Sequence, residues 1–133
     1  MINWRVLTKN ISQKDMADFG EFRETSHGNH ILSGFVVSKG SGKAYAIQIQ
    51  MDTEKFSPNS RVKVYCNCDN FKFQWAYVLH KHDALIAPQN FVLLPPKQTN
   101  PNMDVGCCKH IKVFLELAND ATLKHLNMTK GQI

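Results

Sequence analysis

The chain has 133 residues, a formal net charge of +5 and a hydrophobic content of 43%. This length fits one domain, 1–133, and the hydrophobic content excludes a disordered chain. The apolar runs are too short to span a membrane, and the first residues lack the apolar segment of a secretory signal peptide. We therefore expect an intracellular protein that binds no membrane and whose cysteines are free or bind a metal.

The first thirty residues carry only weak patterns. Ser12 and Asp15 are spaced as in the capping box at the start of a helix. The inner face of that helix would include Met16, Phe19 and Phe22. The residues at 25–29 are typical of a turn. We interpret 1–30 as an N-terminal extension of the domain.

From residue 31 onwards, apolar residues alternate with polar ones as they do in β-strands. The predicted strands cover 31–38, 44–51 and 61–65. A glycine-rich turn at 39–42 joins the first two strands, so we expect them to pair as a hairpin. Three antiparallel strands in consecutive order are the simplest topology for this pattern.

Helical spacing of apolar residues returns after the strands. It covers 71–85, whereas 87–106 contains four prolines and is predicted to be irregular. The strongest helix prediction is 109–118, and 119–133 is predicted to be a helical tail. The apolar stripe of the strongest helix consists of Ile111, Phe114, Leu115 and Ala118. The predicted fold class is α+β, with a small antiparallel sheet of about three strands and helices on one side.

Four side chains that commonly bind metals lie in two close pairs. Cys66 and Cys68 follow the last predicted strand, and Cys108 and His110 lie where the strongest predicted helix begins. Side chains two residues apart on a strand point the same way, and the free amides of a helix N-terminus stabilise thiolates. Three thiolates and one imidazole are typical of a structural zinc site. We therefore predict that these pairs hold a structural zinc ion.

Three alternatives remain open from the residues alone. The cysteines can be buried as small hydrophobic side chains without a metal. A disulfide can join the two pairs, for example between Cys66 and Cys108. Cys107 also lies three residues before His110, a spacing that suits a helix. Spacing therefore does not choose between Cys107 and Cys108 as the third thiol.

The two pairs together resemble the SWIM-type zinc finger family. The motif of that family is Cys-x-Cys, a variable gap and Cys-x-His on a ββα unit, and here Cys66-x-Cys68 and Cys108-x-His110 carry the resemblance. It covers a core of about 31–118 and implies that Cys108, rather than Cys107, is the ligand. The spacer 69–107 is longer than in many members. The resemblance also implies a module that binds DNA or proteins and is not an enzyme.

The function that we expect is a non-enzymatic interaction module without a small-molecule substrate. The sequence contains no phosphate-binding loop, dinucleotide-binding turn or HExxH helix. Basic side chains of the C-terminal segment are candidates for contacts with DNA or RNA phosphates: Lys109, Lys112, Lys124 and Lys130. A solvated helix surface is the alternative for these lysines. Four aromatic residues could stack on bases, although aromatic residues of small domains more often lie in the core: Trp4, Phe73, Trp75 and Tyr77.

The second functional hypothesis is a structural or assembly protein. Compact stand-alone SWIM modules resemble bacteriophage-encoded proteins, which implies the host cytoplasm or the virion as the location. In this hypothesis the chain is a component of a phage virion or of another large complex. The proline-rich segment 87–106 and the chain termini would contact protein partners, and zinc would serve stability alone.

Overall fold

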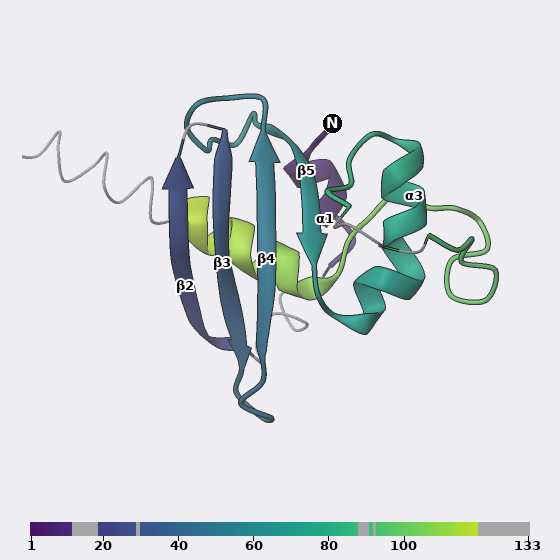
Figure 1. Ribbon diagram of the computed structural model, residues 1–133, viewed down its shortest axis with the longest axis horizontal. Coiled ribbons are helices and arrows are strands. Elements are labelled where there is room, and N and C mark those ends of the chain that lie inside the picture. The colour runs from purple at the N-terminus through teal and green to yellow at the C-terminus, as the bar shows by residue number, and fades with distance from the viewer. Residues whose placement is uncertain (12–18, 29, 88–90, 92, 120–133) are drawn as a thin grey trace, which may run out of the picture.

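The computed structural model describes residues 1–11, 19–28, 30–87, 91 and 93–119, with 19–28 described through the backbone. An antiparallel sheet forms its centre, and the described strands follow the order β1-β5-β4-β3-β2 (Figure 1). The strands are β1 (Ile2–Asn3), β2 (Phe19–Gly28), β3 (Ile31–Ser38), β4 (Ala44–Met51) and β5 (Arg61–Cys66). The described helices are α1 (Trp4–Thr8), the π-helix η1 (Phe71–Trp75), α3 (Ala76–Lys81) and a helix over 109–119. The fold class is α+β.

The three predicted strands correspond to β3, β4 and β5, but the prediction of about three strands was too low. β2 pairs with β3 along its whole length, from Phe19 opposite Ser38 to Gly28 opposite Ile31. The predictions of a helix through Phe19 and of a turn over 25–28 were therefore wrong, and residue 29 of the predicted turn lies outside the described residues. Hydrogen bonds to the β3 backbone supply the structure that the local pattern does not encode. The predicted helix cap at 12–15 lies outside the described residues.

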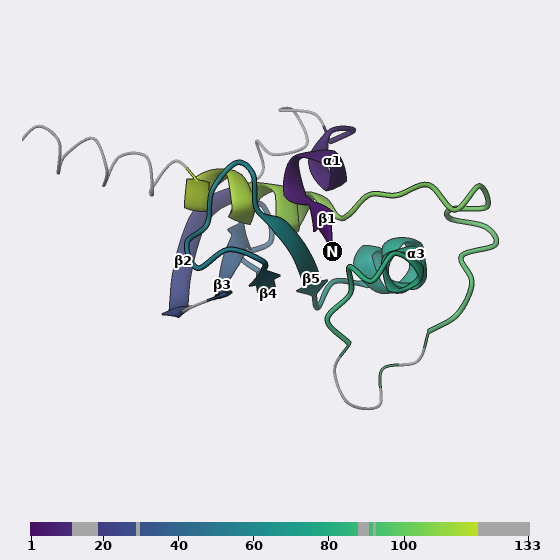
Figure 2. The ribbon, with the colours of Figure 1, turned by 90° about the horizontal axis from the view of Figure 1, so that it is seen from above.

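The hydrophobic core lies against one face of the sheet. Ile47, Ile49 and Met51 of β4 are buried, whereas Gln48 and Gln50 between them are exposed. The helix over 109–119 and α1 cover the buried face, while η1 and α3 lie beyond the β5 edge (Figure 2). The largest fully buried side chains of the two helices that cover this face are Trp4, Leu7, Ile111, Phe114 and Leu115. The predicted stripe of the 109–118 helix is therefore confirmed as a core face.

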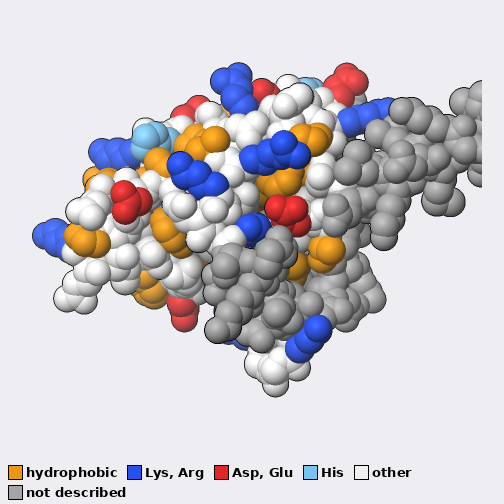
Figure 3. All heavy atoms as spheres, turned by 180° about the vertical axis from the view of Figure 1, so that it is seen from behind, with side chains coloured by type: hydrophobic (Ala, Val, Ile, Leu, Met, Phe, Trp, Pro, Cys, Tyr) orange, Lys and Arg blue, Asp and Glu red, His pale blue; other side chains and the backbone are white. Residues whose placement is uncertain are grey.

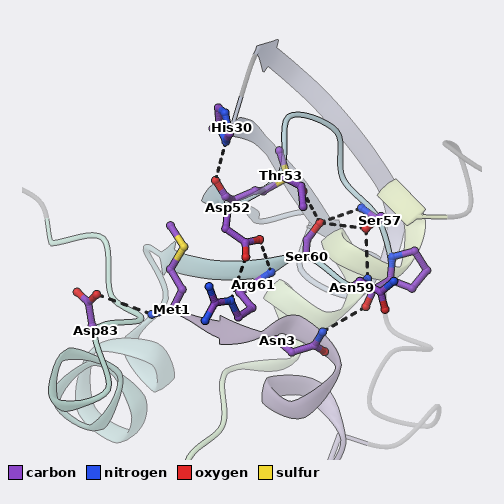
Figure 4. Close-up of polar contacts among 12 residues, drawn as sticks. Met1, Asn3, His30, Asp52, Thr53, Ser57, Asn59, Ser60, Arg61 and Asp83 are labelled. Carbon is purple, nitrogen blue, oxygen red and sulfur yellow. Dashed lines mark hydrogen bonds and ion pairs between the residues drawn. The ribbon is translucent and has the colours of Figure 1, made fainter.

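The connection between β4 and β5 holds the N-terminus in place (Figure 4). The Ser60 hydroxyl accepts a hydrogen bond from the Ser57 amide at 3.0 Å and lies 2.7 Å from the Thr53 hydroxyl. The Asn3 side chain donates to the Pro58 carbonyl oxygen at 3.3 Å. Hydrogen bonds across fifty or more residues therefore fix the start of α1 over the sheet.

The chain after α3 pairs with β5 along the edge that faces away from β4. Asp83 has a φ of 54°, which reverses the chain direction. The Val64 amide then donates to the Ala84 carbonyl at 2.9 Å, and the Ile86 amide donates to the Val64 carbonyl at 3.0 Å. This short parallel pairing gives hydrogen-bond partners to backbone N–H and C=O groups of β5 that would be unpaired at an exposed edge.

The described residues of the segment 87–106 form neither helix nor strand, as predicted. Asn100 is buried and fastens this segment to η1: its side-chain amide donates to the carbonyl oxygens of Gln74 at 3.3 Å and Asp104 at 2.9 Å. Gly106 then passes so close to Trp75 that a Cβ atom there would lie 2.7 Å from the indole ring. These contacts return the chain to the start of the helix over 109–119. Among the described residues, no helix combines the length and the hydrophobicity needed to cross a membrane.

Candidate metal centre

The end of β5 and the start of the helix over 109–119 bring four potential metal ligands together. Cys66, Cys68, Cys108 and His110 are all buried, and their ligand atoms all lie within 4.8 Å of one another. Sγ of Cys66 lies 3.9 Å from Nδ1 of His110. Around a tetrahedral zinc ion with Zn–S bonds of about 2.3 Å, the ligand atoms lie about 3.8 Å apart. The cluster is therefore able to coordinate a metal ion of this size.

The turn after β5 is fixed by hydrogen bonds to β4. The Asn67 amide donates to the Ala46 carbonyl at 3.2 Å, and the Ala46 amide donates to Oδ1 of Asn67 at 3.0 Å. Cys68 then receives a hydrogen bond on Sγ from the Phe71 amide at 3.3 Å. The backbone amide and the side-chain oxygen of Asn67 are both bonded to Ala46, so these hydrogen bonds fix the turn that carries the two cysteines.

The two adjacent cysteines at the helix start face different surroundings. Cys107 directs its thiol to the Leu7 carbonyl oxygen of α1, 3.6 Å away. Cys108 lies in the cluster with the other three ligands. All four cysteines are free in the structure. The structure thus brings Cys108, and not Cys107, to Cys66, Cys68 and His110.

Hydrogen bonds and burial separate the pKa values of the three clustered thiols. Hydrogen bonds with Cys108 and then with Cys66 lower the pKa of Cys68. A hydrogen bond with Cys108 also lowers the pKa of Cys66, but its hydrogen bond with Cys68 and its burial outweigh this and raise it to about 12. Burial raises the pKa of Cys108. These shifts favour a thiolate on Cys68 over thiolates on Cys66 and Cys108.

Metal binding is expected to release about two protons per ion near pH 8, since Cys66 and Cys108 must ionise to become ligands. Rising pH weakens the competition from protons, so the zinc affinity is expected to rise roughly a hundredfold per pH unit. Isothermal titration calorimetry in buffers with different enthalpies of ionisation measures the number of protons. In a metal-free chain that circular dichroism shows to be folded, release of about three protons, or of none, would contradict the assignment of one thiolate to Cys68.

An aromatic ring covers the imidazole of His110. Tyr45 of β4 stacks on His110, with ring centroids 3.8 Å apart and an interplanar angle of 22°. Nζ of Lys43 lies 5.4 Å from the centroid of the Tyr45 ring. This stacking restricts the rotation of the imidazole, which is the role that neighbouring groups commonly have around metal ligands. The sequence indicates only a half-buried strand residue at Tyr45, so its contact with the cluster was missed.

The structure describes two of the four lysines that were predicted to contact phosphates, and these two lie in different surroundings. Lys109 is exposed, whereas Lys112 is only 8% exposed and donates a hydrogen bond from Nζ to the Ile11 carbonyl. Because Nζ of Lys112 is bonded to the Ile11 carbonyl oxygen, this side chain is directed to the protein itself, and its phosphate contact stays a prediction. Lys124 and Lys130 lie outside the described residues.

Comparison with known proteins does not assign the chain to a family. The chain matches no protein-family model, no curated protein and no solved structure. The features that indicate its function are therefore the four clustered side chains and the surfaces beside them.

Proposed function

We propose that Cys66, Cys68, Cys108 and His110 bind one zinc ion and that this ion stabilises a non-enzymatic binding module. The observation that carries the proposal is the convergence of four buried ligand atoms within 4.8 Å. Sulfur-rich sets with one imidazole are typical ligands of zinc, whereas magnesium and calcium prefer oxygen. Four protein ligands fill the tetrahedral shell of zinc and leave no position for a water molecule. Such a site supports a structural rather than a catalytic role.

The order of the elements supports a SWIM-type arrangement. Cys66 ends β5, which pairs with β4, and His110 lies in the first turn of a helix that packs on the same sheet. This order corresponds to the ββα unit of the SWIM resemblance. The long spacer 69–107 contains η1, α3 and the segment that Asn100 fastens to η1. We propose that this spacer is an integral part of the domain and that it contacts DNA, RNA or a protein.

Exposed apolar side chains favour the assembly role as a second candidate function. Phe73 of η1 is 52% exposed, and Leu94 and Met103 of the spacer are 65% and 37% exposed. Apolar side chains on a surface are common at protein interfaces when they form a patch. In this reading the chain is a virion or other assembly component, and replacement of these three residues by serine would reduce its incorporation into the particle while leaving the zinc content unchanged.

Elemental analysis of the purified chain tests the proposed metal directly. We expect about one zinc ion per chain after expression without added metal, because the Cys₃His set and its burial favour zinc over the other metals available in cells. Mass spectrometry under non-denaturing conditions gives the stoichiometry independently. A preparation that is folded, reduced and free of zinc would overturn the proposal.

A further inference from the structure

Two adjoining hollows lie beside the metal centre. One, of about 450 Å³, is bordered by the end of α1, by η1 and by the segment before the helix over 109–119. The other, of about 400 Å³, reaches the start of that helix at Lys109 and His110. Ile11, Trp75 and Cys107 line both hollows, which therefore form one groove. We call it the Trp75 groove. Each hollow has the size of a small-ligand site.

The aromatic wall of the groove is held in a fixed orientation. Trp75 is half-buried, and its indole Nε1–H donates to Oδ1 of Asn70 at 3.1 Å. The side-chain amide of Asn70 in turn donates from Nδ2 to Oε1 of Gln74 at 2.6 Å. Gly106 packs directly against one part of the ring. An aromatic ring that is fixed before binding offers a stacking surface at little cost in conformational entropy.

Basic side chains border both halves of the groove. Lys9 lines the larger hollow and Lys109 lines the smaller one, and both are exposed. Arg5 is exposed one helical turn before Lys9. Asp104 is the acidic residue among the described side chains that line the two hollows. On the face that carries α1, Lys and Arg side chains are spread among hydrophobic ones, with some Asp and Glu side chains between them (Figure 3). The groove therefore suits a partner with negative charge and planar apolar groups.

We propose that the Trp75 groove binds single-stranded nucleic acid, with a base stacked on Trp75 and phosphates paired with Lys9 and Lys109. Bases stack readily on aromatic side chains when they are not paired, and phosphates supply one negative charge per nucleotide. An acidic peptide would satisfy the lysines but not the indole surface, and a duplex does not present its base faces. The site rests on the proposed function, because zinc would hold the wall formed by residues 107–110.

Fluorescence anisotropy with a labelled oligothymidylate tests the proposal on the zinc-loaded full chain. The variant Lys9→Gln/Lys109→Gln should bind at least roughly tenfold more weakly than the wild type at low salt. Its slope of log affinity against log salt should be smaller by about 1.4, at about 0.7 per lost phosphate contact. The matched control is Lys39→Gln/Lys55→Gln, which removes two exposed lysines outside the groove and should change the affinity less than about twofold.

Tryptophan fluorescence tests the stacking separately. The chain has two tryptophans, and Trp4 is fully buried, so quenching by the oligonucleotide should come from Trp75. The quenching should disappear in Trp75→Phe, whose remaining signal comes from Trp4. Equal weakening by the two lysine pairs, tighter binding of a duplex of the same length, or displacement of the oligonucleotide by polyglutamate at equal charge would each overturn the proposal.

The zinc content of each protein separates this proposal from the metal site. A wild-type chain that holds one zinc ion and melts cooperatively, yet does not bind oligothymidylate at low salt, would overturn the nucleic-acid site and leave the metal site intact. A chain without zinc would instead overturn the proposed function on which this site rests.

Discussion

Removal of the metal from the zinc-loaded chain is expected to abolish most of its stability. At neutral pH, structural zinc sites bind their ion with an apparent free energy of about 10–16 kcal/mol. The free energy of unfolding of a whole domain is only about 5–15 kcal/mol. The cluster joins β5 to the helix over 109–119, whose side chains Ile111, Phe114 and Leu115 are fully buried in the core. Loss of the ion therefore weakens the packing of the main core helix. Thermal melting followed by circular dichroism, with and without a strong chelator, measures the effect.

Hydrogen exchange should show where the metal-free chain opens first. We expect loss of protection at 66–72 and 109–115, because these segments carry the ligands. The β3–β4 hairpin should stay protected longer, since its cross-strand hydrogen bonds do not involve the cluster. A melting temperature that is unchanged in protein shown to be metal-free would contradict a structural role of the ion.

The sequence predicts best where local pattern and tertiary environment agree. In β4, every second residue is apolar, and the same residues face the core because strand side chains alternate between the two faces. The clustering of Cys66 and Cys68 with the distant His110 follows from ligand chemistry, which requires the pairs to meet if one ion binds both. These features need no knowledge of the complete fold.

The strands at both ends of the sheet could not be predicted in this way. β1 has only two residues, Ile2 and Asn3, which is too short for any periodic pattern. β2 contains polar residues and two register shifts, between Phe19 and Glu21 and between Glu24 and Ser26. A strand that is defined by pairing with β3 and interrupted by bulges does not show the alternation of a regular strand. The structure of these segments is thus determined by their neighbours.

Two side chains at the site, Lys112 and Tyr45, make contacts between distant parts of the chain that the sequence pattern does not reveal. Lys112 reaches the Ile11 carbonyl 101 residues earlier in the sequence. Tyr45 contacts His110 from a strand that is separated from the Cys-x-His pair by both the Cys-x-Cys turn and the long spacer. A local pattern reports whether a side chain is buried, but it does not report which side chain covers it.

The strongest test of the ligand set compares Cys107→Ala with Cys108→Ala. The two residues are adjacent and both fully buried, so the loss of apolar contact is similar and only the metal ligand differs. Cys107→Ala should keep its zinc and lose about 1 kcal/mol of unfolding free energy, typical of a small cavity. Cys108→Ala removes one of four ligands, and an equal share of the apparent zinc-binding free energy of about 10–16 kcal/mol is about 3 kcal/mol. The substitution should therefore weaken zinc binding at least roughly a hundredfold.

Competition with a chromophoric chelator measures both affinities on the same scale, and the wild type sets the reference. The two variants also separate the contact with α1 from metal binding, because only Cys107 directs its thiol to Leu7. If Cys107→Ala lost its zinc while Cys108→Ala retained it, the thiol facing α1 would be the true ligand. The chain between Gly106 and the helix would then have to be rotated relative to the arrangement in the structure. If neither substitution weakened binding, the ion would be held elsewhere, and the cluster at the end of β5 would be four buried side chains without a metal.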